Sequence, residues 1–202
     1  MLKAAIGLFA GLALAIPVSA HSAAVRISGA VETLIGDTLV VKSDDRQDIT
    51  IALSKDTRIA ALANRQLSDI KPGDFVGSVA IKGRDGKLHA QEVHIFPEAM
   101  RGTGEGHRHM AKPDQTMTNA TVTAVTGVAE APTAHVLTLS YKGGVQEIEV
   151  GPDARIVTFI SGDRSLLKPG AMVVVSVTKG PDGSWIARGM QAEKDGVLPL
   201  MF

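Results

Sequence analysis

Two stretches of the chain, KPGDFVGSVAIKGRDG at residues 71–86 and KPGAMVVVSVTKGPDG at residues 168–183, follow one plan. Each opens with Lys-Pro-Gly, continues as a run of strand-forming residues and ends in Asp-Gly. Proline followed by glycine suits a type II turn, because glycine accepts the positive φ that this turn requires. The closing Asp-Gly is typical of the tight turn that joins two strands of a β-hairpin. The two stretches therefore predict two copies of one all-β unit.

The similarity extends well beyond these hairpins. Residues 51–93 align with residues 148–190 at an offset of 97 without a gap. The matches outside the hairpins include Asp56 with Asp153, Arg58 with Arg155, Ile59 with Ile156, Ser68 with Ser165 and Ala90 with Ala187. A fixed offset over this length indicates an internal duplication.

Hydrophobic alternation predicts the strands of each unit. In the return strand of the first hairpin, Leu88 and Ala90 are expected to point inward, and then Val93 and Ile95. The break in this period predicts a β-bulge near residues 91–92. Upstream, residues 25–43 predict two strands joined at a Gly-Asp turn at 36–37. Residues 48–53 predict a third strand, and residues 57–62 a fourth strand or a short helix.

Each unit would thus hold five or six short strands in roughly 75 residues. Closing such a sheet into a barrel removes its exposed edges, which favours two tandem small β-barrels of OB-like form. A flat sandwich is the alternative. We expect the first barrel at residues 24–98, a connector at 99–117 and the second barrel at 118–197. The apolar tail at 198–202 is expected to dock within the molecule, because an exposed apolar tail favours aggregation.

The first twenty residues have the pattern of a secretory signal peptide. A short positive start, MLK, precedes an apolar run and then the small residues VSA, so cleavage would leave His21 at the mature N-terminus. An uncleaved anchor is the alternative, but the run is shorter than the roughly 20 residues that span a membrane comfortably. We expect a periplasmic or secreted protein with no stable membrane span.

Composition excludes several function classes. The chain has 21 Lys and Arg residues against 21 Asp and Glu residues, and its net charge is zero. A nucleic-acid binder usually shows a basic excess, so we expect no nucleic-acid partner. The chain has no cysteine, which excludes disulfides, thiolate metal sites and thiol nucleophiles.

Each unit resembles a bacterial periplasmic domain family of unknown function. The resemblance rests on Gly29-Ala30-Val31, on TLVV at 38–41, on KPGDFV at 71–76, on the Asp-Gly turn at 85–86 and on Ala90 with Val93. The second copy departs from the pattern at Ala171, which stands in place of the aspartate. The connector, with RGTGEGHR followed by TMTNATV, is similar to tandem proteobacterial proteins loosely labelled as metal-transport related. Those proteins usually continue with Pro-Trp-Asp where this chain has HMA at 109–111. The resemblance implies a fold and a compartment, and no catalytic residue.

The connector holds the residues that look most like a metal site. His107 and His109 alternate, and alternate side chains of an extended backbone share a face, so both imidazoles could bind one ion. Met110 follows directly, and a thioether favours copper in its reduced state. Further ligands could come from nearby residues, namely Met100, Glu105, Asp114 and Met117. The alternative is a glycine-rich linker without a metal, and on that interpretation the protein has no cofactor.

Other polar residues are better explained as surface features. An N-terminal His21 could bind copper through its amine and imidazole with help from His89 or His94, but we expect all three to face solvent. Residues 43–48, SDDRQD, lack the ligand spacing of a calcium loop and suit a charged hairpin tip. The Asp-x-Arg pairs that end at Arg58 and Arg155 are interpreted as strand-end ion pairs or turn contacts.

The sequence shows no nucleophile elbow, phosphate-binding loop or paired-carboxylate signature, so we expect no enzyme activity. The leading hypothesis is a non-enzymatic binding or interaction protein of the cell envelope, whose partner is a glycan, a peptide or another envelope protein. The alternative is a periplasmic accessory protein that binds copper or zinc through His107, His109 and Met110.

Overall fold

The computed structural model describes residues 25–129 and 131–200, so the expected signal peptide and His21 lie outside the described residues. The described residues form thirteen strands and three single-turn 3-10 helices, which confirms the all-β prediction. The strands are β1 (Val25–Ile35), β2 (Thr38–Ser43), β3 (Asp48–Ala52), β4 (Arg58–Asn64), β5 (Phe75–Lys82), β6 (Leu88–Ile95), β7 (Gly106–His109), β8 (Gln115–Val128), β9 (Ala131–Tyr141), β10 (Gly144–Val150), β11 (Arg155–Ser161), β12 (Met172–Lys179) and β13 (Trp185–Ala192). The helices are η1 (Leu67–Asp69), η2 (Glu98–Met100) and η3 (Arg164–Leu166).

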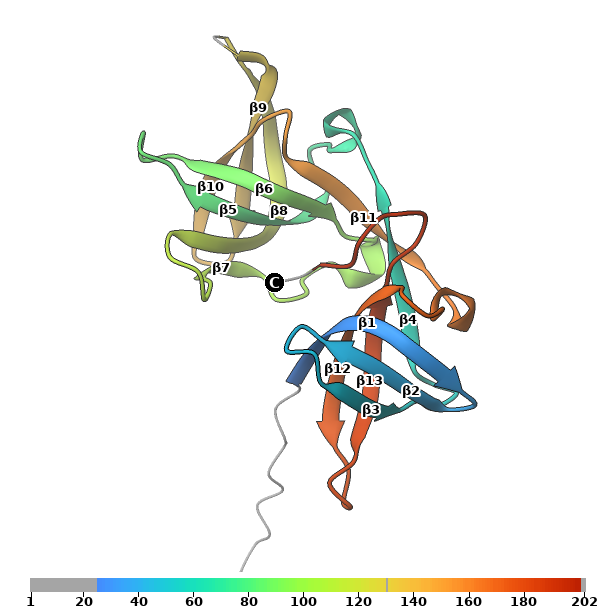
Figure 1. Ribbon diagram of the computed structural model, residues 1–202. Coiled ribbons are helices and arrows are strands. Elements are labelled where there is room, and N and C mark those ends of the chain that lie inside the picture. The colour runs from blue at the N-terminus through green and yellow to red at the C-terminus, as the bar shows by residue number, and fades with distance from the viewer. Residues whose placement is uncertain (1–24, 130, 201–202) are drawn as a thin grey trace, which may run out of the picture.

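Ten of these strands close into two five-stranded barrels. One barrel runs β10-β9-β8-β5-β6 and is closed by the parallel pairing of β6 with β10. The other runs β13-β12-β1-β2-β3 and is closed by the parallel pairing of β3 with β13. Figure 1 shows the barrels as two lobes, with the first in green and yellow and the second in blue and red. The prediction of a small closed barrel is therefore confirmed.

The two copies exchange their hairpins. The first barrel takes β5 and β6 from the first copy and β8, β9 and β10 from the second. The second barrel takes β1, β2 and β3 from the first copy and β12 and β13 from the second, so blue and red strands share one lobe in Figure 1. Residues 24–98 and 118–197 therefore do not each close a barrel, which differs from the expected assignment. The hairpins are equivalent in the repeat, so each fits the open side of either copy.

The linking strands β4 and β11 pair with each other between the barrels. Leu62 lies opposite Phe159 in this antiparallel pair. These two residues are separated by the repeat offset of 97, so each is the counterpart of the other. The pairs Ala60 with Ser161 and Asn64 with Val157 exchange under the same offset. The pairing is thus centred on a pseudo-twofold axis that relates the two copies.

The hairpins themselves match the sequence predictions. Between Val79 and Ala80 the partner residue changes from Glu92 to Ala90, which leaves Gln91 as the bulge. The second copy repeats this irregularity between Ser176 and Val177. Gly73 and Gly170 of the Lys-Pro-Gly turns have φ angles of +97° and +86°. The bulge and the glycine turns are therefore confirmed.

Residues 99–117 are more ordered than a linker. Strand β7 pairs with β8, and β8 already begins at Gln115. Arg101 donates to both carboxylate oxygens of Glu98 and to the carbonyl oxygen of Gly73, the latter at 3.0 Å. The segment is thereby held against the Lys-Pro-Gly turn of the first copy.

The chain after β13 turns back between the lobes (Figure 1, dark red). Leu200 is 6% exposed and packs against Leu62 and Val157. This contact confirms the predicted docking for the described part of the tail.

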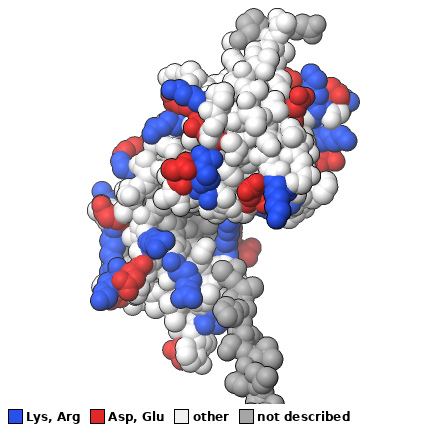
Figure 2. Space-filling model, turned by 180° about the vertical axis from the view of Figure 1, so that it is seen from behind, with Lys and Arg blue, Asp and Glu red and all other residues white. Residues whose placement is uncertain are grey.

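The surface agrees with the neutral composition. Figure 2 shows two lobes over which basic and acidic side chains are interspersed on the face drawn. Within the described residues, no helix is both long and apolar enough to span a membrane.

Candidate functional site

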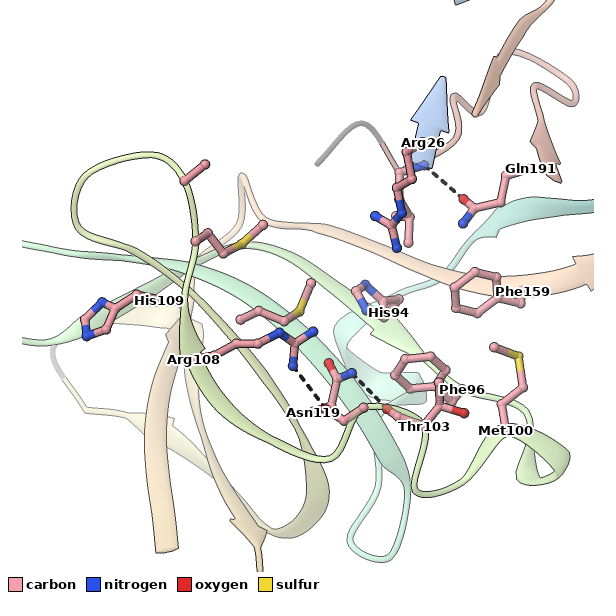
Figure 3. Close-up of a pocket in the computed structure, with 15 residues that line it drawn as sticks. Arg26, His94, Phe96, Met100, Thr103, Arg108, His109, Asn119, Phe159 and Gln191 are labelled. Atoms are coloured by element: carbon pink, nitrogen blue, oxygen red, sulfur yellow. Dashed lines mark hydrogen bonds between the residues drawn. The ribbon is translucent and has the colours of Figure 1, made fainter. Parts of the chain in front are cut away.

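A cavity of about 610 Å³ lies where the two barrels meet (Figure 3). Sites for small-molecule ligands usually measure roughly 300–1,000 Å³. Its walls come from β1 and β13 of one barrel, from β6 and β8 of the other, from β11, from β7 with the neighbouring connector and from the C-terminal tail. The cavity therefore depends on both barrels and on the segments that join them.

One wall of the cavity is apolar. The ring centroids of Phe96 and Phe159 are 5.5 Å apart, and the two rings are stacked. Met117 and Leu200 are buried beside them, and Met100 also lines this wall. Phe159 occupies the pseudo-twofold position on β11, so the centre of the strand exchange also forms part of the cavity.

His94 is a buried side chain in this wall and is 2% exposed. Its ring meets Phe96 and Phe159 edge-on, with centroid distances of 5.0 and 5.9 Å. The neighbouring strand makes room for the ring with Gly77, where a Cβ atom would stand 2.1 Å from Nε2 of His94. The prediction that His94 faces solvent is therefore wrong. The side chain does point outward from its own barrel, but the rings of Phe96 and of Phe159 on β11 cover it.

A part-buried ion pair lies next to His94. Nη1 of Arg155 donates to Oε2 of Glu92 at 3.0 Å, and Oε1 of Glu92 lies 3.5 Å from Nδ1 of His94. Arg155 also donates to the carbonyl oxygen of Leu198, which ties the tail to this pair. Arg155 thus neutralises the carboxylate that stands beside the wall.

The expected Asp-x-Arg pairing does not occur. Arg155 bonds Glu92 across the parallel β6–β11 pairing, and the described residues show no ion pair between Asp153 and Arg155 or between Asp56 and Arg58. The guanidinium of Arg155 thus reaches across to the neighbouring strand β6, away from the turn that precedes it.

Two arginines bring positive charge to the cavity. Arg26 enters from β1 and Arg108 from β7, and Figure 3 shows them approaching from different sides of His94. Nη1 of Arg108 donates to the carbonyl oxygen of Gly104 at 3.1 Å. None of the described residues that line the cavity is an aspartate or a glutamate. An adjoining hollow of about 480 Å³ shares Arg26 and adds Arg58, again without an acidic residue in the described lining.

The connector forms one side of the cavity. Nδ2 of Asn119 donates to the carbonyl oxygen of Thr103 at 2.9 Å, as drawn in Figure 3. This bond holds residues 103–104 beside β8, and Gly104 in turn accepts from Arg108. The position of the Arg108 guanidinium is thus set by the folded connector.

The residues expected to bind a metal are only partly brought together. His107 and His109 share a face of β7, with ring centroids 6.4 Å apart. His109 and Met110 line the cavity, although Figure 3 shows the His109 ring directed away from the other labelled side chains. His107 lies outside this lining and against Tyr141, with Nδ1 2.8 Å from Oγ1 of Thr118. Burial is the first cause that lowers the pKa of His107 from its usual value, and the nearby His109 is the second.

The other candidate ligands do not complete that site. Met100 and Met117 line the cavity, whereas Oε1 of Glu105 accepts a hydrogen bond from the backbone of Lys142 at 2.9 Å. The described residues contain no group of three or more histidine and acidic side chains placed to hold a metal. The side chain of His89 reaches the surface, as expected, with 41% of it exposed, and its Nε2 lies 3.0 Å from Oδ2 of Asp85.

Sequence reasoning missed Arg26, Arg108 and Gln191 as lining residues, although the repeat contained a signal. At the return strand, His94 corresponds to Gln191 and Glu92 to Gly189. The Lys-Pro-Gly and Asp-Gly turns match between the copies, but these positions in or beside the cavity do not. The two copies share their turns but differ in the residues at these outward-facing strand positions. This difference was the signal in the sequence that could have indicated a site.

Comparisons of the chain with protein-family models, with curated proteins and with solved structures give no significant match. The residues that line the cavity therefore carry the functional conclusion.

Proposed function

We propose that this chain is an exported, non-enzymatic binding protein of the cell envelope, and that the cavity between its barrels is the ligand site. The observation that carries the proposal is the lining of the cavity. A broad apolar wall with a few convergent polar groups is the usual composition of a small-molecule site. Here the apolar part is centred on Phe96 and Phe159, and the polar groups include Asn119 and two arginines.

The arrangement of the walls supports binding over catalysis. Catalysis by side chains needs a nucleophile next to a base, or paired carboxylates in a cleft. The described lining offers neither, since its acidic neighbour Glu92 is bonded to Arg155. Because the walls come from both barrels, a ligand would also hold the two barrels together.

An uncharged fluorescent dye tests the proposal. N-phenyl-1-naphthylamine, whose fluorescence rises in apolar surroundings, would be titrated into the purified protein and into an Ala111→Trp variant. Ala111 is exposed and lines the cavity, so the indole is expected to block entry without disturbing a core. Ile35→Trp is the matched control, because Ile35 is 75% exposed and lies in the β1–β2 hairpin.

We expect saturable binding that Ala111→Trp weakens by about tenfold or more and Ile35→Trp leaves unchanged. Equal binding by all three proteins would show that the dye binds elsewhere and would contradict the proposal.

A second candidate function is the binding of copper or zinc by His107, His109 and Met110. The observation that favours it is the pair of imidazoles on one face of β7. Metal-binding histidines commonly hold one ring nitrogen by an outer hydrogen bond, and Nδ1 of His107 lies 2.8 Å from Oγ1 of Thr118. Nε2 of His107 would then be the ligand atom.

Calorimetric titration with Cu(I), Cu(II) and Zn(II) tests this second candidate. Sub-micromolar binding that is lost in a His107→Ala/His109→Ala double variant, and kept in the control His89→Ala, would support it. Absence of binding, or binding that the double variant retains, would rule it out.

A further inference from the structure

We propose that the open edge of strand β7 binds an extended acidic segment of a partner protein, which adds to the sheet as a further strand. This inference goes beyond the proposed function, because it assigns a protein-binding edge beside the small-molecule cavity.

The first step is the place of β7 in the sheet. The path of strands from β10 to β3 is closed at both ends, because β10 pairs with β6 and β3 pairs with β13. Strand β7 lies off this path and pairs with β8 alone, from Gly106 opposite Asn119 to His109 opposite Thr116. Figure 1 shows it at the rim of the first lobe. Its second edge therefore meets no other strand among the described residues.

The second step is the direction of the backbone groups. Alternate residues of an antiparallel strand bond to the strand on one side, and the residues between them face the other side. The N–H of Met110 donates to the carbonyl oxygen of Gln115, so Gly106, Arg108 and Met110 are the residues that bond to β8. The backbone groups of residues 107 and 109 consequently point to the open edge. In the described part of the chain, no hydrogen bond from outside the β7–β8 ladder reaches them.

The third step is the chemistry that such an edge recognises. His107 and His109 each present one N–H donor and one C=O acceptor, at the spacing of a strand. The backbone of another extended chain repeats the same groups at the same spacing, which is the basis of recognition by strand addition. Arg108 and His109 are exposed, so a chain can approach the edge. Because β7 has four residues, the segment that pairs with it is short.

The fourth step is the charge along the edge. Residues 106–112, GHRHMAK, contain an arginine, a lysine and two histidines, and no acidic residue. The acidic residue before them, Glu105, accepts a hydrogen bond from the backbone N–H of Lys142 at 2.9 Å. The next one, Asp114, lies directly before β8. Opposite charges on paired strands stabilise the pair, so the edge favours a segment that carries aspartate or glutamate.

A second copy of this chain fits the same edge less well. Antiparallel pairing that uses both His107 and His109 would place Arg108 directly opposite the same arginine of the other copy. Like charges at directly opposite positions destabilise a strand pair. An acidic segment has no such conflict. Its side chains on the face of Arg108 and Met110 would lie beside the cavity, because both of these residues line it.

Peptide binding to the purified full protein tests the inference. The probe is the fluorescein-labelled peptide Glu-Val-Glu-Val-Glu-Val, with binding read by fluorescence anisotropy at about 0.15 M salt. One control peptide has lysine in place of glutamate, and another keeps the glutamates but has every backbone nitrogen methylated. His109→Pro removes the outward N–H of residue 109 and no bond of the β7–β8 ladder, and an edge strand tolerates proline at such a position. His109→Ala is its matched control, because it loses the imidazole and keeps the N–H.

We expect the wild type to bind the glutamate peptide saturably, and the lysine and methylated peptides at least about tenfold more weakly. His109→Ala should bind the glutamate peptide within about threefold of wild type, and His109→Pro at least about tenfold more weakly. Arg108→Gln should also weaken this binding. Arg84→Gln should not, because Arg84 is exposed in the β5–β6 hairpin and its variant loses the same charge elsewhere.

Absence of saturable binding by the wild type, or equal binding of the three peptides, would overturn the inference. Equal losses in His109→Ala and His109→Pro would also overturn it, because the imidazole and not the backbone would then be the contact. So would a wild type that sediments as a dimer while His109→Pro sediments as a monomer, since a second copy would then occupy the edge. The methylated peptide tests the same backbone bonds with the wild type alone, so the result does not depend on the folding of His109→Pro.

Discussion

At the scale of single residues, the site depends on a missing side chain. His94 is buried because Gly77, directly opposite on β5, carries no Cβ atom. A Cβ at that position would stand 2.1 Å from Nε2 of His94 and 2.8 Å from Oδ1 of Asn119. His94 and Asn119, two of the polar side chains that line the cavity, are thus both positioned against one glycine.

We therefore expect Gly77→Ala to destabilise the fold by about 1–3 kcal/mol, because the methyl group overpacks a filled site. Gly127→Ala is the matched control in β8, since a Cβ at Gly127 would meet nothing within 4 Å. Urea denaturation measures both free energies of unfolding. Equal stabilities for the two variants would contradict the packing described for His94.

The connector histidines predict a dependence on pH. The pKa of His107 is lowered from 6.5, first by burial and second by His109. When a base has a lower pKa in the folded state, the unfolded state takes up the proton first, so stability falls as pH decreases through 6.5 toward the folded pKa. We expect His109→Gln to raise the pKa of His107 and yet leave it below 6.5, because burial persists.

An NMR titration of the His107 imidazole in metal-free buffer measures this shift. A pKa of 6.5 or above in the variant would show that the charge of His109, and not burial, is the main cause. No change at all would show that the two rings do not interact.

At the scale of single residues, the sequence predicted some side-chain positions correctly and others wrongly. It identified the imidazoles of His107 and His109 as a pair on one face, which β7 bears out. It placed His94 in solvent, because an outward-facing strand position is exposed unless another part of the chain covers it. No local pattern around His94 indicates that Phe159, far along the chain on β11, packs against its ring.

At the scale of elements, the turns and bulges were predictable and the connector was not. Glycines at positive φ and a break in apolar alternation are local signals, and both appear where the sequence places them. Strand β7 is four residues long and consists of a glycine, two histidines and an arginine, none of which is a strong strand former. Its pairing with β8 therefore depends on tertiary contacts. Short polar strands of this kind lack the periodicity that reveals a strand in a sequence.

The C-terminal tail offers an element-level test of docking. Leu200 is 6% exposed and packs against Leu62 and Val157 near the pseudo-twofold axis, whereas Leu198 is 45% exposed. We expect Leu200→Ala to lower the free energy of unfolding by about 2–3 kcal/mol, since it removes buried methyl groups and leaves a partial void. Leu198→Ala, the control, should cost less than about 1 kcal/mol by the same denaturation measurement. Equal costs would mean that the tail does not anchor through Leu200.

At the scale of the whole molecule, the exchange of hairpins creates the cavity. Strands β4 and β11 carry the chain from one barrel to the other, and their pairing holds the barrels at a set distance. Sequential barrels, one for each copy, would bury the same hydrophobic faces and use the same turns. The repeat pattern is therefore identical for both arrangements. This is why the sequence predicted the barrels correctly and could not predict which copy supplies each hairpin.

The exchange is tested most directly by one disulfide. The chain has no cysteine, so a Ser28→Cys/Val174→Cys variant can form a single intramolecular bridge. Ser28 and Val174 are opposite each other across β1 and β12. Directly opposite residues of antiparallel strands have Cα atoms about 4.5–5.5 Å apart, within the range that a disulfide accepts. In sequential barrels Ser28 would instead face Gly77, the counterpart of Val174, and the two cysteines would lie in different barrels.

The measurement is mass spectrometry of the oxidised monomer, with the crosslinked peptides mapped after digestion. The exchanged arrangement predicts a monomer in which residue 28 is bonded to residue 174. A monomer that retains two free thiols, or a bridge found only between two chains in a dimer, would contradict the exchange and with it the cavity on which the proposed function depends.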